Sequence, residues 1–194
     1  MTGPKVLAFA GSTRSGSYNK KLIALAAEAS RARGAQTTLI VLRDYPMPLY
    51  DGDLEDTQGL PENGKRLKEL FYDHDALLIA SPEYNSSISG VLKNTIDWMS
   101  RQQPNEVALQ CFKGKTCGLL AASPGALGGL RGLVTLRSIL GNIQVLVMPN
   151  QFALSKADQA FDEAGKLKDA KNLSAMEGVV AQLVETTRKL RAPI

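Results

Sequence analysis

The chain has 194 residues, of which 44% are hydrophobic and 22% are charged, and its formal net charge is +4. This length predicts one domain over residues 1–194, and the composition is that of an ordinary globular protein. No apolar run approaches the about 18 residues of a membrane span, and the apolar part of the N-terminal segment is too short for a secretory signal. The positive charges are scattered, so nothing in their pattern supports nucleic-acid binding.

The chain has two cysteines, Cys111 and Cys117. Two cysteines form no disulfide framework, and no cluster of His, Cys and Asp has the spacing of metal ligands. We therefore expect a reducing, cytoplasmic setting and no bound metal. Cys117 lies inside an apolar run and is expected to fill the core.

Apolar runs alternate with segments of helical periodicity along the whole chain. Strands are predicted at residues 5–10, 37–42, 76–80, 116–121 and 144–148. Helices are predicted at residues 19–33, 63–72, 89–101, 130–140 and 170–190. Nearly continuous apolar strands are typical of a parallel sheet covered on both faces. The alternation predicts a three-layer α/β domain with a five-stranded parallel sheet, whose ligands bind beyond the carboxyl ends of the strands.

The first candidate site is the loop after the first strand, "GSTRSGSY" at residues 11–18. Thr13 stands where a dinucleotide fingerprint G-x-G-x-x-G needs its second glycine, and the loop lacks the Gly-Lys-Ser/Thr of a Walker A loop and the cysteine of a phosphatase loop. Its hydroxyls, its backbone amides and Arg14 precede a helix N-terminus, which favours a bound anion. An equally weighted alternative is a polar turn whose serines cap the helix.

The second candidate site is the loop after the third strand, "SPEYNSSIS" at residues 81–89. Pro82 stiffens this loop, Tyr84 offers a flat face and Asn85 offers a two-sided amide. The loop is longer than the two to six residues that a simple connection needs, which favours a functional role. The alternative is a long turn that ends in a serine cap.

The third candidate site follows the fourth strand and contains Gly125, Gly128 and Gly129. Glycines let the backbone approach a ligand closely, and the next helix begins here. The alternative is simple flexibility at a helix start. In a flavodoxin-like strand order, 2-1-3-4-5, the three loops would meet where this fold binds FMN.

The three loops contain few of the side chains that acid–base catalysis needs. The single histidine, His74, precedes the third strand and so belongs to the opposite edge of the sheet, which leaves a Ser-His-Asp hydrolase without its base. Glu83 is the one carboxylate in the three loops. A site with so few acid–base groups indicates that a bound cofactor carries the chemistry.

Four stretches resemble the flavodoxin-like NAD(P)H-dependent FMN reductase family, which includes quinone, chromate and azo-dye reductases. They are "GSTRSGSYNKKL", "SPEYNSSISGVLKNTIDWMSR", "SPGALGGLRGLVTLRSIL" and "AFDEAGKLKD". The resemblance implies a flavodoxin-like fold with sheet order 2-1-3-4-5, FMN as cofactor, NADPH or NADH as co-substrate, and a homodimer or homotetramer. From the charge pattern and the short apolar runs, we expect no nucleic-acid partner and no membrane partner.

The resemblance also implies roles for particular residues. The FMN phosphate would be held by Ser12, Arg14, Ser17, Tyr18 and Asn19. The ribityl chain and ring would be contacted by Pro82, Glu83, Tyr84, Asn85 and Ser86. The pyrimidine side of the ring would be contacted by Ser123, Gly125 and Gly128. No side chain is assigned a catalytic role, because the chemistry takes place on the flavin.

The implied reaction is ping-pong. NADPH or NADH passes a hydride to N5 of FMN, and a quinone-like, azo, metal-oxyanion or free-flavin acceptor then takes two electrons. One alternative is a flavodoxin-type electron carrier, against which the basic charge counts because such carriers are expected to have acidic docking surfaces. The other is a flavin-binding regulatory protein.

Three further segments carry weaker expectations. The apolar residues of helix 89–101, including Trp98, wrap further round than one sheet face needs, which indicates a dimer, although Trp98 as ordinary core is nearly as well supported. Residues 44–63 are either a wall of the acceptor site, with Tyr50 reaching a partner's flavin, or a surface excursion, which is favoured slightly. Residues 102–114 form an extended loop that could make a rim over the flavin. Arg101 and Arg131 are candidates for the phosphates of the nicotinamide nucleotide, or else solvated charges.

Overall fold

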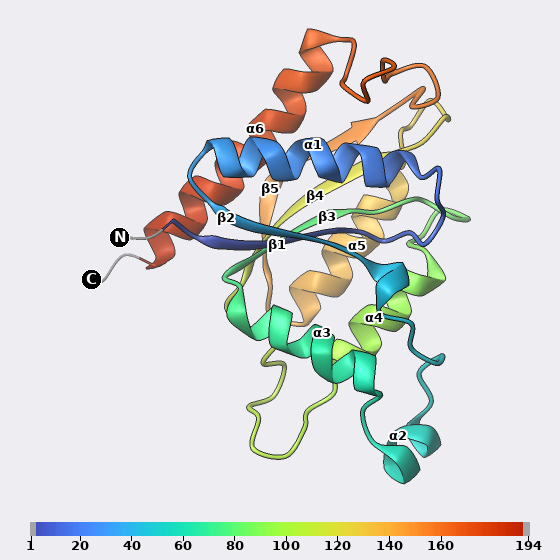
Figure 1. The fold of residues 1–194 in the computed structure, drawn as a ribbon, viewed down its shortest axis with the longest axis vertical. Helices are drawn as coiled ribbons and strands as arrows, with labels where there is room; N and C mark the ends of the chain where they lie inside the picture. The colour runs from blue at the N-terminus through green and yellow to red at the C-terminus, as the bar shows by residue number, and fades with distance from the viewer. Residues whose placement is uncertain (1–2, 192–194) are drawn as a thin grey trace.

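The computed structural model describes residues 3–191, which build one five-stranded parallel sheet (Figure 1). The strand order β2-β1-β3-β4-β5 confirms the flavodoxin-like prediction. The strands are β1 (Lys5–Ala10), β2 (Gln36–Val41), β3 (Ala76–Ala80), β4 (Thr116–Ala122) and β5 (Leu146–Leu154). The order reverses between β1 and β3, so the loops that follow these strands begin at the same edge.

Helices cover both faces of the sheet. They are α1 (Tyr18–Ala32), α2 (Gly52–Gln58), α3 (Glu62–Asp73), α4 (Gly90–Ser100), α5 (Leu130–Asn142) and α6 (Ala170–Arg191). One apolar core joins α1 and α6 to the face that carries Val6 and Ala8, and the second joins α3, α4 and α5 to the face that carries Leu7 and Phe9. In Figure 1, α1 and α6 lie above the sheet, and α3 and α4 lie below it. The alternating side chains of each strand thus supply both cores.

The fifth strand is longer than predicted, because it continues past Pro149 to Leu154. Pairing with β4 shifts from Cys117↔Val147 to Leu119↔Gln151, so β5 holds two extra residues there. Such a bulge accommodates a proline, which has no amide to give to the ladder. The amide of Asn150 donates to the Gln182 side chain at 3.1 Å instead. The prediction ended at residue 148 because proline ordinarily stops a strand.

Two features at the β2 side differ from the prediction. β2 is an edge strand and is half exposed, with Leu39 38% accessible, so it is not covered on both faces as expected. The helix α2 was not predicted, because it has only seven residues, Leu54 is its one apolar side chain, and none of its residues is buried. It lies away from the sheet at the lower end of Figure 1, beyond the short 3₁₀ turn at Leu42–Asp44.

The wide apolar surface of α4 is covered within the chain. Trp98 is fully buried, its ring nitrogen donates to the carbonyl of Pro48 at 2.8 Å, and its ring meets Tyr50 edge-on at 5.0 Å. The side chain of Asn94 also donates to Pro48 and accepts from the amide of Tyr50. The segment before α2 therefore covers this helix, and Trp98 belongs to the core, so it gives no support for a dimer.

The extended loop at residues 102–114 packs under α3 and makes no rim over the candidate site on its own chain, contrary to that expectation. Its Glu106 forms an ion pair of 2.6 Å with Lys68, whose side chain is 3% exposed, and accepts a hydrogen bond from Tyr72. Burial raises the pKa of Cys111, in the same loop, to about 11. In Figure 1 this loop hangs below α3, at the edge where β4 begins.

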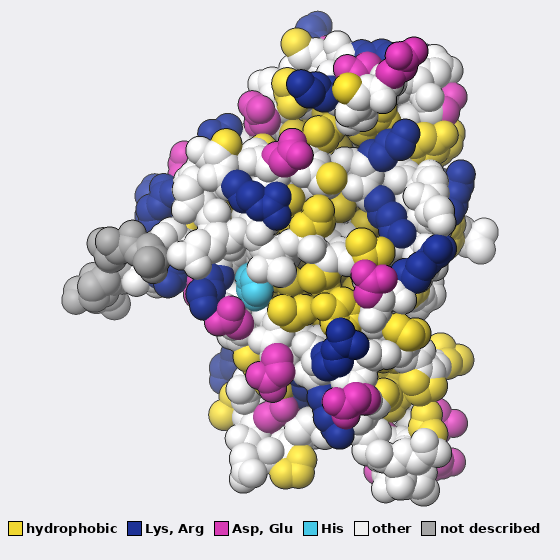
Figure 2. Space-filling view, viewed as in Figure 1, with side chains coloured by type: hydrophobic (Ala, Val, Ile, Leu, Met, Phe, Trp, Pro, Cys, Tyr) yellow, Lys and Arg dark blue, Asp and Glu magenta, His cyan; other side chains and the backbone are white. Residues whose placement is uncertain are grey.

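The surface charge, the two cysteines and the helices can be compared with what the sequence predicts. On the face shown in Figure 2, lysines and arginines are scattered among aspartates and glutamates and form no single basic patch. Cys111 and Cys117 are both unpaired and buried. None of the helices within residues 3–191 is long and apolar enough to cross a membrane.

Candidate functional site

The loops after β1, β3 and β4 meet at the carboxyl edge of the sheet and line two adjoining cavities. The smaller cavity, of about 80 Å³, lies between all three loops, and the larger, of about 410 Å³, lies between the second and third. Glu83 and Ser123 line both. All thirteen predicted site residues line one cavity or the other: Ser12, Arg14, Ser17, Tyr18, Asn19, Pro82, Glu83, Tyr84, Asn85, Ser86, Ser123, Gly125 and Gly128.

The first loop is shaped by its own hydroxyls. Ser17 caps α1 by accepting a hydrogen bond from the amide of Lys20, and Ser12 accepts from the amide of Arg14 at 3.3 Å. The capping alternative is thus correct for Ser17, but it does not exclude a ligand. The first turn of α1 contains no acidic residue, so its amides and its dipole face the cavity uncompensated.

Positive charge surrounds this loop. Lys20 donates to the carbonyl of Thr13, and Arg43 donates to the Ser15 hydroxyl at 3.2 Å. The exposed guanidinium of Arg14 has no hydrogen bond or ion pair with any residue between 3 and 191. Arg14 is therefore the cation at this cavity that can bind an anion without first breaking another contact.

Asn19 joins α1 to the end of β4. Its side-chain nitrogen donates to the carbonyl of Ala122, and its side-chain oxygen accepts from the amide of Ala122, both at 2.9 Å. Asn19 is 3% exposed. These two bonds link the first loop to the third, and they leave one hydrogen of the Asn19 nitrogen and one lone pair of its oxygen for other partners.

The second loop contains a tight turn. The amide and carbonyl of Tyr84 bond those of Ser87 at 3.0 Å, and Asn85 and Ser86 between them have φ values of 51° and 63°. Positive φ at both central positions is the pattern of a type I′ turn, which is costly for serine and recurs at functional sites. Ser89 then bonds the carbonyl of Gly11 at 2.6 Å and caps α4, so it ties the second loop to the first.

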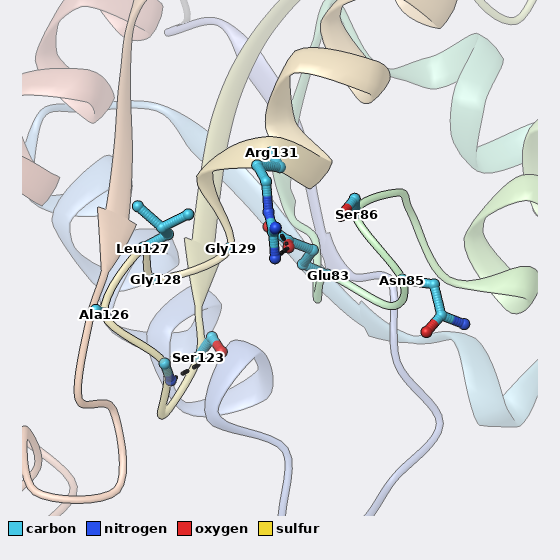
Figure 3. A pocket seen from close by; sticks show the side chains of 10 residues that line it. Glu83, Asn85, Ser86, Ser123, Ala126, Leu127, Gly128, Gly129 and Arg131 are labelled. Carbon is cyan, nitrogen blue, oxygen red and sulfur yellow. Dashed lines mark hydrogen bonds and ion pairs between the residues drawn. The ribbon is translucent and has the colours of Figure 1, made fainter.

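Glu83 connects the second loop to α5. One carboxylate oxygen accepts from Arg131 at 2.8 and 2.6 Å, and the other accepts from the amide of Gly132 at 3.2 Å. Figure 3 shows the two side chains pointing toward each other and in contact, at the larger cavity. The N-terminus of α5 is therefore already capped by a carboxylate, and the one carboxylate found among the described residues that line the two cavities has its charge neutralised.

Two glycines of the third loop are needed for different structural reasons. A Cβ on Gly128 would lie 2.7 Å from backbone atoms of Leu154 and Ser155, so this glycine is required by packing within the chain. A Cβ on Gly125 would meet only the Ser123 hydroxyl, at 3.6 Å. Gly125 is thus the glycine whose missing side chain leaves the cavity open, which was expected of all three.

The donor set fits a flavin mononucleotide. Hydroxyls, free helix amides and an unpaired arginine at the smaller cavity suit a phosphate, and an open glycine-lined cavity beside it suits the edge of a flat ring. Within residues 3–191, no histidine, cysteine or lysine lines either cavity, so none of these common proton-transfer groups is at hand there. Six lining residues were absent from the predicted set, although all lie in or next to the third loop: Ala122, Pro124, Ala126, Leu127, Gly129 and Arg131.

His74 and Arg101 both lie outside the two cavities. His74 lies at the amino edge of the sheet, as expected, and bonds Leu70 and Thr38 with its two ring nitrogens. Arg101 pairs with Glu55 at 2.9 Å and lies over the ring of Tyr50, so it already has a partner, and it is not among the residues that line the two cavities.

Comparison with known proteins gives a consistent result. The family model for NADPH-dependent FMN reductases matches residues 4–159. The chain is 38% identical to an NAD(P)H-dependent FMN reductase of Pseudomonas aeruginosa, over 96% of this chain and 97% of that protein. It is 34% identical to a quinone reductase of Pseudomonas putida, over 82% of each chain.

A solved structure has the same fold. The flavoenzyme FerB of Paracoccus denitrificans, an NAD(P)H:acceptor oxidoreductase, superposes with a TM-score of 0.82 at 28% identity and covers 96% of this chain and 98% of its own. The fold, the two cavities and these relatives all indicate the same family. The chain belongs to the NADPH-dependent FMN reductase family and is an NAD(P)H-dependent flavin oxidoreductase.

Proposed function

We propose that this oxidoreductase reduces quinone-like acceptors with electrons from NADPH or NADH, using FMN held by the thirteen residues that line the two cavities. One observation carries the proposal: residues from three separate loops line two adjoining cavities whose donors suit a phosphate and a flat ring. The acceptor class is supported by relatives that are named quinone reductases in Pseudomonas putida and Solanum tuberosum.

The residues of the site bind and orient rather than react. Ser12, Ser17 and the first amides of α1 would bind the phosphate, and Arg14 would balance its charge. Asn19 would act as a positioning residue through Ala122. FMN, when bound, supplies the two-electron chemistry that no side chain here provides.

The second and third loops would orient the ring. The Glu83–Arg131 pair fixes the second loop against α5, and the Tyr84–Ser87 turn presents Asn85 and Ser86 at the larger cavity. Because these contacts are made within the chain, they would hold the two loops in place, and little ordering of the loops would be needed on binding.

We also propose a cellular location and an oligomeric state. Two buried, unpaired cysteines support a cytoplasmic location. A homodimer or homotetramer is expected from the family resemblance, and light scattering of the purified protein measures it directly.

The test is steady-state oxidation of NADPH and NADH by FMN-loaded protein, with and without a soluble quinone. Rapid oxidation that depends on the quinone is the expected result. Protein that binds FMN but oxidises neither nucleotide in the presence of the quinone would refute the proposal.

A further inference from the structure

A third cavity lies at the amino edge of the sheet, away from the FMN site. It has a volume of about 250 Å³ and is lined by the start of β4, the residues just before it, and the end of α6. Lys115, Thr116 and Thr187 are among the lining residues, and Lys113 and Arg191 add two further cations.

Lys115 is the unusual residue of this cavity. Lys115 is only 8% exposed, and its ammonium group donates to the carbonyl of His74. No carboxylate within residues 3–191 forms an ion pair with it. Buried charges in proteins are ordinarily paired, because desolvation of an isolated ion is expensive.

The nearby carboxylate supplies only part of the missing charge, because it already has other partners. Asp75 lines the same cavity, but its carboxylate oxygen accepts from the amide of Lys5 at 2.8 Å and pairs with Arg191 at 3.2 Å. Burial lowers the pKa of Lys115, and the charges of Cys111 and Asp75 act in the opposite direction without outweighing it. The hydroxyls of Thr116 and Thr187 bond each other at 2.6 Å, and Thr187 also donates to Leu183.

We propose that this cavity is a second anion site, in which a small phosphate-type oxyanion is the counter-ion of Lys115 and is also approached by Lys113. Lys115 has three N–H donors, of which one bonds His74, so two are left for oxygens of the anion. The exposed Lys113 adds long-range attraction from the mouth of the cavity. A bound anion would join β4 to the end of α6 and so stabilise the fold at this edge.

The test uses FMN-loaded protein, so that the phosphate-binding loop of the first site is already filled. Thermal unfolding is followed in inorganic phosphate and in chloride of the same ionic strength. We expect phosphate to raise the Tm by about 3–6 °C at roughly ten times its dissociation constant. The matched variants are Lys115→Met, Lys113→Gln and Lys171→Gln, the last of which removes an exposed charge at the start of α6.

Lys115→Met should lose the phosphate effect and should have a higher Tm than the wild type without phosphate, because it removes an unpaired buried charge. Lys113→Gln should reduce the effect, and Lys171→Gln should keep it. A wild type that phosphate does not stabilise would overturn the proposal, as would an equal stabilisation of Lys115→Met. Oxidation of NADPH by the same variants is expected to be unchanged, so this outcome is independent of the function proposed above.

Discussion

Asn19 and Ala122 bond each other twice, since the side-chain amide of Asn19 meets both the amide and the carbonyl of Ala122 at 2.9 Å. The two residues come from α1 and β4, and both line the smaller cavity. This pair sets the spacing between the loop proposed to hold the phosphate and the loop proposed to hold the ring.

Replacement of Asn19 by alanine should therefore affect both folding and binding. It leaves two buried backbone groups of Ala122 without partners, which should lower the free energy of unfolding by about 2–4 kcal/mol. Urea denaturation of FMN-free protein measures this, and Asn150→Ala, at an exposed position of β5, is the control. If Asn19→Ala unfolds like the control, the structural role of the pair is wrong. FMN affinity should fall in Asn19→Ala as well.

Gly125 and Gly128 should respond differently to added side chains. Gly128→Ala places a Cβ against backbone atoms of Leu154 and Ser155 at a φ of 63°, so we expect a loss of at least about 2 kcal/mol of stability. Gly125→Leu should unfold like the wild type but bind FMN more weakly, because its side chain enters the open cavity. Denaturant unfolding and FMN titration of both variants separate the two effects. Equal losses of stability would show that Gly125 is also required by packing.

The Lys68–Glu106 pair should make stability depend on acid pH. Burial alone would raise the pKa of Glu106, but hydrogen bonds from Lys68, Tyr72 and the amide of Gln103 outweigh it and hold the pKa below the ordinary 4.5. A carboxylate with a lowered pKa stabilises the fold above the unfolded-state value, and this contribution is lost as pH falls through the folded-state value. The free energy of unfolding should therefore decrease as the pH is lowered from 4.5.

Glu106→Gln tests this pair. It leaves Lys68 buried without its counter-ion, so we expect a loss of about 3 kcal/mol at neutral pH and a weaker pH dependence below 4.5. Glu69→Gln, at an exposed position of the same helix as Lys68, is the control. A Glu106→Gln protein with the acid profile of the control would contradict this account.

The sequence predicted the sheet well where apolar runs are uninterrupted, as in β1 and β3. It failed at β5, because Pro149 ends a strand by the usual rule and the bulge depends on pairing with β4. It also failed at α2, which has no apolar face. The predicted site residues gather at one edge because parallel strands end together. The contacts that fix them, Asn19 with Ala122 and Glu83 with Arg131, join residues 103 and 48 positions apart, which spacing along the chain does not reveal.

The most direct test compares the binding of FMN and riboflavin, which differ only in the phosphate. If the loop at residues 11–18 holds the phosphate, the wild type should bind FMN at least about 30-fold more tightly than riboflavin. Arg14→Gln should weaken FMN binding about tenfold and leave riboflavin binding unchanged. Equal affinities for the two flavins, or an equal loss of both in Arg14→Gln, would contradict the proposed site.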